Sequence, residues 1–326
     1  MILHIGLPRT GTTTLQKFLF SDETLFAPPR NAPREISRLH LTAGIGNALP
    51  DSLADMDTAK NILSEVRKSS GKDKVILISQ EKVTSLGNNL AIQRTYALRL
   101  QQIDPEAKVI ITLRRQQGLI TSRFTQMKVR KHWAALGLLS SAKSPGKKSG
   151  FDRKLMRKLY VPPFLDWVKM GLKNQYSCWF SIMNYYDLYN SYAEVLGPDN
   201  VKILFFEDMK SNKTVFAEQL ADFIGIDPEK VIHTITRTAN KSPKGTAFFS
   251  RVIENIKKPG EGVNPGYALR YFLGIEKKIN EIHDGLLDLI RDSYGLQNRK
   301  LAEALDTNLA DRGYLMDTKG KEAVGL

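Results

Sequence analysis

The chain has 326 residues, 42% of them hydrophobic, and a formal net charge of +14. This length suffices for one large α/β domain or two small ones, and no apolar run approaches the length of a membrane-spanning helix. The single cysteine, Cys178, excludes intrachain disulfides and metal clusters of the cysteine type. The positive charge indicates a polyanionic partner, but no zinc-finger spacing, RNP motif or basic-leucine heptad specifies nucleic acid. Because a strand begins at once and leaves no room for a signal peptide, we expect a cytoplasmic protein.

The first twenty residues contain the strongest pattern in the chain. Residues 2–5 form a short apolar run that predicts a buried strand of a parallel sheet, and a helix with an apolar face follows from about residue 15. Between them lies the run G-L-P-R-T-G-T-T, from Gly6 to Thr13. A glycine-bounded turn before a helix favours anions, because the first N–H groups of the helix lack internal partners and its dipole attracts negative charge. We therefore expect a phosphate or sulfate loop; the alternative is an ordinary strand–turn–helix.

The side chains of this loop distinguish it from a nucleotide-triphosphatase loop. Arg9 supplies positive charge, and four threonine hydroxyls supply neutral donors: Thr10, Thr12, Thr13 and Thr14. The spacing is that of a Walker A loop, G-x-x-x-x-G-K-[ST], except that Thr12 stands in the position of the lysine. That lysine reaches the β/γ-phosphates and works beside Mg²⁺, so its absence disfavours ATP chemistry.

Two candidate proton acceptors follow in chain order. His40 lies in an irregular stretch, 21–56, where it either lines an acceptor site or is a surface or capping residue. After a helix over 57–68, the apolar run 74–79 predicts a strand, and Glu81 comes just past its end. Ligands of α/β proteins bind at the carboxyl ends of the strands, so Glu81 has the position of a functional carboxylate. The alternative is a solvated glutamate paired with Lys82.

An arginine and a serine follow the next predicted strand. A helix is expected over 89–103 and a β-branched strand over 109–113, which ends at Arg114. Ser122 lies eight residues further along, near the second turn of the following helix. An arginine fork and a hydroxyl at a sheet edge can converge on one dianion, although a strand followed by a basic helix is also a common arrangement.

A strongly basic segment, 128–158, comes next, with ten lysines and arginines against the single acid Asp152. We expect part of it to be mobile, either as a solvated surface or as an arm that holds an anionic acceptor. Helices are then expected over 162–172 and 181–196, a strand over 201–206, and helices over 275–291 and 298–305.

Two of these motifs together resemble the sulfotransferases that use 3′-phosphoadenosine 5′-phosphosulfate (PAPS). Their phosphosulfate loop usually reads P-K-[TS]-G-[TS]-[TS], and here Arg9 replaces the lysine; Arg114 and Ser122 resemble their 3′-phosphate signature. The run Y-x-x-V-L-G-x-x-x-V-x-I-L-F-F-E-D-M, which ends at Met209, resembles the bacterial members. The resemblance implies a three-layer α/β fold of the P-loop nucleoside-triphosphatase type, with a central parallel sheet flanked by helices, in a single domain over residues 1–326.

The resemblance also implies the site. Arg114 and Ser122 would hold the 3′-phosphate of PAPS, and Ser79-Gln80-Glu81 resembles the S-x-E strand end that supplies the general base in several sulfotransferase families. Glu81 would then take the acceptor's proton, with His40 as the rival base, and no metal is needed. The 5′-phosphosulfate would be held by the loop: Pro8, Arg9, Thr10, Gly11, Thr12, Thr13 and Thr14, with Arg9 stabilising charge on the leaving oxygen.

The expected activity is therefore transfer of a sulfuryl group from PAPS to an acceptor hydroxyl or amine. The basic segment favours an anionic glycan or glycolipid as the acceptor, which would make the reaction a carbohydrate sulfation. One alternative is an ATP-dependent kinase or nucleotidase, against which Thr12 and the lack of a clear Walker B aspartate count. The other is a non-enzymatic polyanion-binding protein on a nucleotide fold, which the net charge supports.

Overall fold

The computed structural model of the chain describes residues 1–27, 55–70, 74–84, 90–124, 164–173, 179–236 and 283–317. The chain divides into two compact units. The first unit contains the sheet and comprises Met1–Leu119, Gly171–Asn240 and Ile290–Leu326; the second comprises Ile120–Met170 and Lys241–Leu289. The prediction of one domain over residues 1–326 stays a prediction. Among the described residues, no helix combines the length and apolar character needed to cross a membrane.

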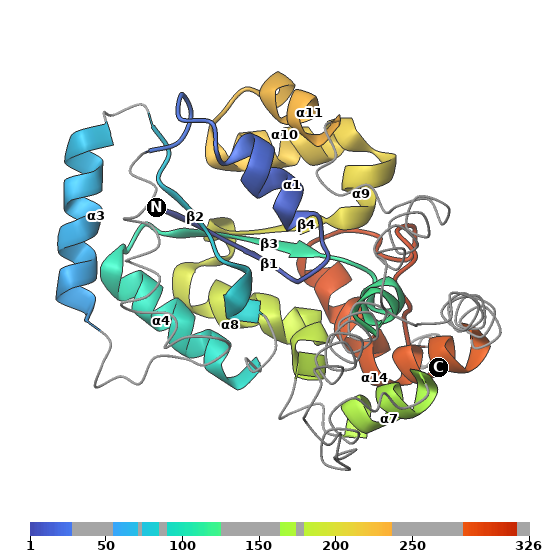
Figure 1. Ribbon diagram of the computed structural model, residues 1–326. Helices are drawn as coiled ribbons and strands as arrows, with labels where there is room; N and C mark the ends of the chain where they lie inside the picture. The colour runs from blue at the N-terminus through green and yellow to red at the C-terminus, as the bar shows by residue number, and fades with distance from the viewer. Residues whose placement is uncertain are drawn as a thin grey trace, which may run out of the picture. The chain divides into compact units, whose positions relative to one another are not determined.

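The elements alternate between strands and helices along the chain (Figure 1). Residues 116–124 are also helical. In order, the elements are β1 (Ile2–Gly6), α1 (Thr12–Thr14), η1 (Leu15–Leu19), α3 (Met56–Ser70), β2 (Leu77–Ser79), η3 (Glu81–Thr84), η4 (Leu90–Ile92), α4 (Gln93–Ile103), β3 (Lys108–Leu113), α7 (Phe164–Lys173), η6 (Trp179–Met183), α8 (Tyr185–Leu196), η7 (Pro198–Asn200), β4 (Val201–Phe205), α9 (Phe206–Ser211), α10 (Lys213–Ile224), α11 (Pro228–Thr236) and α14 (His283–Ala304).

The four strands form one sheet in the order β2-β1-β3-β4, and every pair is parallel. Strand β2 is short and pairs with β1 at three positions, the last of which sets His4 opposite Ser79. Strand β3 pairs with β1 as far as Gly6 and Thr112. Because parallel strands end at the same edge, the segments that follow β1, β2, β3 and β4 all begin there.

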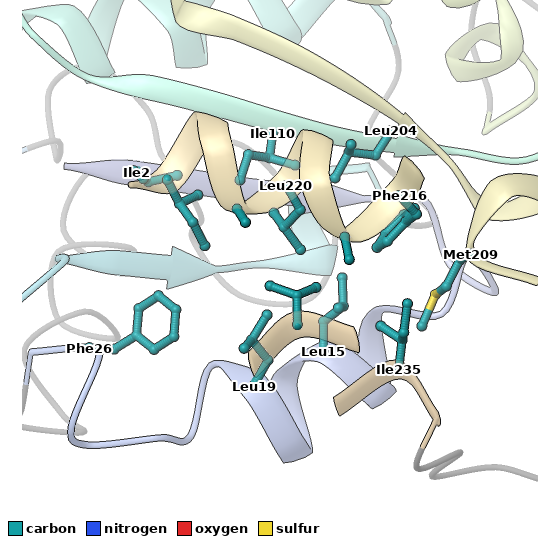
Figure 2. Close-up of a cluster of buried hydrophobic side chains, with 14 residues drawn as sticks. Ile2, Leu15, Leu19, Phe26, Ile110, Leu204, Met209, Phe216, Leu220 and Ile235 are labelled. Atoms are coloured by element: carbon teal, nitrogen blue, oxygen red, sulfur yellow. The ribbon is translucent and has the colours of Figure 1, made fainter. Parts of the chain in front are cut away.

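Helices cover both faces of this sheet, as the strands' continuous apolar runs predict. In Figure 1, α1, α10 and α11 lie on one side, and α4 and α8 lie on the other. Figure 2 shows the core of the first side, where Ile110 and Leu204 from the strands meet Leu15 and Leu220 from the helices. Side chains alternate along a strand, so the buried Ile111 faces α4 and α8 instead. The predicted α/β fold of the P-loop type, with a parallel sheet between two helical layers, is confirmed.

One boundary differs from the prediction for a physical reason. Separate helices over 275–291 and 298–305 were expected, but α14 runs without a break through Gly295. A Cβ added at Gly295 would lie 2.8 Å from the Cα of Asp317, closer than real side chains allow. The glycine therefore admits the C-terminal segment against the helix, and it does not end the helix.

Candidate active site

The loop between β1 and α1 is a tight turn that only small residues permit. A Cβ at Gly6 would collide with the side chain of Thr12, and a Cβ at Gly11 would lie 2.7 Å from the Sδ atom of Met209. Gly11 has a φ of 83°, in the left-handed region that favours glycine. Its carbonyl oxygen accepts a hydrogen bond of 2.9 Å from the Thr14 N–H, which closes the first turn of α1. The loop and helix start therefore have the geometry that the sequence predicted.

Arg9 occupies a strained position in this loop. Its φ is 77°, a left-handed conformation that costs a non-glycine residue about 1–2 kcal/mol. The side chain is exposed, so its charge is available to a ligand. The Nη1 atom of Arg114 donates a hydrogen bond of 3.0 Å to the carbonyl oxygen of Arg9. This bond from the end of β3 helps to hold the strained peptide in place.

The loop threonines divide by exposure. Thr10 is fully buried, and its hydroxyl donates to the carbonyl oxygen of Leu7 at 2.6 Å. Thr12 and Thr14 are buried as well, whereas Thr13 is exposed at the first turn of α1. Thr10 therefore shapes the loop in this structure, and Thr13 presents its hydroxyl to solvent.

Glu81 lies beside this loop. It begins η3 directly after β2, and the hydroxyl of Thr84 in the same turn donates a hydrogen bond of 2.9 Å to the carbonyl oxygen of Gly6. Partial burial raises the pKa of Glu81 above its ordinary value, and the positive charge of Arg9 partly opposes that rise. The structure thus brings Glu81 and Arg9 within electrostatic reach of one another.

A cavity of about 530 Å³ opens where β3 and β4 end. Phe206 lines it, and its ring has the Cζ atom of Arg114 at 4.9 Å and the Nζ atom of Lys210 at 4.6 Å. Two cations on one aromatic ring are held by cation–π attraction. No ion pair among the described residues includes Lys210, so the cavity has a cation to offer an anionic ligand.

The C-terminal segment supports this cavity, which the sequence did not predict. Arg312 pairs with Asp208 at 2.9 Å, and the Tyr314 hydroxyl donates to Glu207 at 3.2 Å. Glu207 also accepts a hydrogen bond of 3.2 Å from the N–H of Arg115. The strand end at Phe206–Asp208 could have been noticed as a site edge from the sequence, but nothing in D-R-G-Y-L marked residues 311–315 as its support.

Four further predictions about the site lie beyond what the structure tests. His40 and the basic segment 128–158 lie outside the described residues. Ser122 belongs to the second compact unit, so its pairing with Arg114 stays a prediction. No group of His, Cys, Asp and Glu among the described residues has the arrangement of a metal site, and the expectation of a metal-free reaction stays a prediction too.

Three solved sulfotransferase structures illustrate the similarity of this chain to known proteins, although none of them is close. The sulfotransferase from Alicyclobacillus acidocaldarius is 12% identical, with a TM-score of 0.45, over 96% of this chain and 98% of that chain. The sulfotransferase domain of the Synechococcus PCC 7002 olefin synthase is 14% identical, with a TM-score of 0.43, over 95% of each chain. Mouse sulfotransferase SULT7A1, complexed with PAP, is 18% identical, with a TM-score of 0.33, over 79% of this chain and 66% of that chain.

The family assignment comes from the sequence itself. No curated protein matches the chain. The family model of the sulfotransferase domain matches residues 1–258, which contain the loop, Glu81, Arg114 and the strand end at Phe206. This match covers well over half of the 326 residues. The chain belongs to the sulfotransferase family.

Proposed function

We propose that this protein transfers a sulfuryl group from PAPS to an acceptor hydroxyl or amine and releases 3′-phosphoadenosine 5′-phosphate (PAP). The observation that carries the proposal is the meeting of three groups at one sheet edge. Arg9 lies in the anion loop after β1, Glu81 follows β2, and Arg114 follows β3 and donates to the loop. Family membership supplies the reaction class, and this arrangement supplies an anion site beside a carboxylate.

The residues present fit a nucleotide donor. The glycines at positions 6 and 11 let the chain turn tightly from β1 into α1, and backbone N–H groups at the start of a helix favour an anion. The neighbouring cavity of about 530 Å³ has the size of a small-molecule site, and Arg114 and Lys210 give it positive charge. Arg114, together with Ser122, would hold the 3′-phosphate, and residues 8–14 would hold the phosphosulfate.

The transfer is an in-line displacement at sulfur. The donor supplies an activated sulfuryl group: the acceptor oxygen or nitrogen forms a bond to sulfur while the bond between sulfur and the bridging phosphate oxygen breaks. Glu81 accepts the acceptor's proton, and its raised pKa makes it a better base than an exposed glutamate. Arg9 and the loop N–H groups stabilise the charge that grows on the bridging oxygen. The acceptor therefore gives its proton to Glu81 and gains the sulfuryl group, and PAP leaves from the opposite side of the sulfur.

An anionic glycan or glycolipid is the proposed acceptor. The support is the net charge of +14 and the basic segment 128–158 of the sequence. A charged surface raises the local concentration of an oppositely charged substrate. We also propose that the chain forms a single domain over residues 1–326 and that the protein is cytoplasmic.

The test uses PAPS carrying ³⁵S and a panel of acceptors: a desulfated glycosaminoglycan, a glycolipid, a tyrosine peptide and a simple phenol. We expect labelled product with a glycan or glycolipid and no requirement for Mg²⁺. ATP with Mg²⁺ and the same acceptors is the control. Phosphoryl transfer in the control, without sulfuryl transfer from PAPS, would contradict the proposal and favour the kinase alternative.

A further inference from the structure

A buried hydrogen-bond network lies under the proposed site and centres on His4. The imidazole is fully buried and uses both ring nitrogens. Its Nδ1 atom lies 2.8 Å from the Ser79 hydroxyl in β2, and its Nε2 atom lies 3.0 Å from the Thr112 hydroxyl in β3. The side-chain amide of Gln16, in η1, donates a third hydrogen bond of 2.9 Å to the Ser79 hydroxyl. One histidine therefore joins three neighbouring strands and the helix that follows the anion loop.

The two hydroxyls that bond to His4 lie close in sequence to two residues of the proposed site. Ser79 lies two positions before Glu81, and Thr112 lies two positions before Arg114. Gln16 lies in the helical segment directly after the loop threonines. A displacement of either strand end would therefore also displace Glu81 or Arg114. Small displacements of groups that position or activate a substrate lower the reaction rate strongly.

The backbone alone holds β2 weakly. This strand has three residues and lies at the edge of the sheet, and the pair His4–Ser79 is the last one before the chain turns into η3. At this end of the strand the Gln80 N–H donates a hydrogen bond of 2.9 Å to the His4 carbonyl oxygen, and the side-chain bond between His4 and Ser79 adds a second restraint at the same pair. The His4 ring is also packed edge-on against Phe20, with centroids 5.2 Å apart, which fixes the ring plane.

Burial, and not the hydrogen-bond pattern, keeps this imidazole neutral. In the neutral ring one nitrogen accepts a hydrogen bond and the other donates one, and the hydroxyls of Ser79 and Thr112 can take either role. Burial lowers the pKa of His4 to about 3, so the ring is neutral throughout the neutral range. Because the ring is buried and neutral, it affects the titratable groups of the site through their positions and not through a charge of its own.

We infer that His4 is a positioning residue, which aligns the strand ends carrying Glu81 and Arg114 with the anion loop through the bonds of its two ring nitrogens. This inference rests on the proposed function for the roles of Glu81 and Arg114. His4 touches no reacting atom in this account, and its effect passes through Ser79 on one side and Thr112 on the other.

The test separates the two sides of the network. One readout is the pKa of Glu81, followed by NMR in protein carrying ¹³C-labelled glutamate and assigned with Glu81→Gln. The other is the Kd for PAP, measured by isothermal titration calorimetry. Thr112→Val should weaken PAP binding roughly three- to tenfold and leave the Glu81 pKa unchanged. Ser79→Ala should lower the Glu81 pKa and leave the affinity for PAP unchanged. His4→Phe, which keeps an aromatic ring, should change both.

Thr234→Val is the matched control. Thr234 is also a buried threonine with one hydrogen bond, 3.0 Å to the carbonyl oxygen of Lys230, but it lies in α11 and has no link to the network. It should lower stability as Thr112→Val does and change neither readout. If Thr112→Val and Ser79→Ala behave like this control, the inference is wrong, even if His4→Phe fails to fold. If wild-type protein does not bind PAP, the proposed function fails, and the Glu81 pKa still tests the network.

Discussion

Acidification should destabilise this protein through His4 before it affects most of the carboxylates. The folded-state pKa of His4 is about 3, because burial opposes the charged form, and the pKa in an unfolded chain is about 6.5. The folded pKa is the lower one, so the unfolded state binds the proton first. Stability is then fully present above pH 6.5 and is lost as the pH falls toward 3. Between pH 7 and pH 5 the loss from this one group should be about 2 kcal/mol, at 1.36 kcal/mol per unit.

The assay compares wild-type protein with His4→Phe by urea unfolding, followed by circular dichroism at pH 7, 6 and 5. His4→Phe should be less stable at pH 7, because it loses hydrogen bonds, but its free energy of unfolding should change less with pH by about 2 kcal/mol. Carboxylates away from the network titrate alike in both proteins, so their effects cancel in the difference, and the contribution of Glu81 is subtracted with its pKa measured by NMR in each protein. The same pH dependence in both proteins would refute the reasoning, since it would mean that His4 is not held neutral by burial.

The site residues give three further predictions, each measured with PAPS and the acceptor found in the labelled-sulfate assay. Arg9→Ala should lower kcat more than it weakens PAP binding, because Arg9 meets charge that grows in the transition state; a change in KM alone would make it a binding residue. Arg9→Ala should also move the acidic limb of the kcat/KM profile to higher pH, since the charge that lowers the Glu81 pKa is lost; an unmoved limb would separate the two residues. Arg114→Ala should mainly raise the KM for PAPS. It should also lower kcat to a smaller extent, because the hydrogen bond from Arg114 to the Arg9 carbonyl oxygen is lost. A lower kcat with an unchanged KM would contradict a role for Arg114 at the 3′-phosphate.

Glu81→Gln should keep the fold and the PAP affinity, lower kcat by roughly two to four orders of magnitude and abolish the acidic limb. The kcat of His40→Ala is measured beside it, because His40 is the other candidate for the base. Near-normal turnover in Glu81→Gln, together with an inactive His40→Ala, would assign the base to His40.

The fold and the tight turn after β1 were predictable because their signals are local. The apolar run of residues 2–5 and the glycines at positions 6 and 11 act within a few residues of one another, and the predicted strand, turn and helix are all present. Element ends were less predictable. The expected strand over 74–79 is shortened to β2, and Val75 pairs with Phe26 in an isolated bridge outside the ladder.

The surroundings of the site were not predictable, because they depend on contacts between distant residues. Arg312 reaches Asp208 across about a hundred positions of the chain, and no local pattern marks that pair. His4 lies within the apolar run of residues 2–5, and it is fully buried. Its bonds to Ser79 and Thr112 follow from strand order and register, which a single sequence does not display.

The central claim is that this protein binds the 3′-phosphorylated nucleotide of a sulfuryl donor. The most direct measurement is calorimetric titration of the wild-type chain with PAP and with AMP, in the presence of a chelator. Loss of a charge-assisted contact costs about 1.5–3 kcal/mol, so PAP should bind roughly ten to a hundred times more tightly than AMP, without metal. Equal affinities, or binding that appears only when Mg²⁺ is added, would contradict the account.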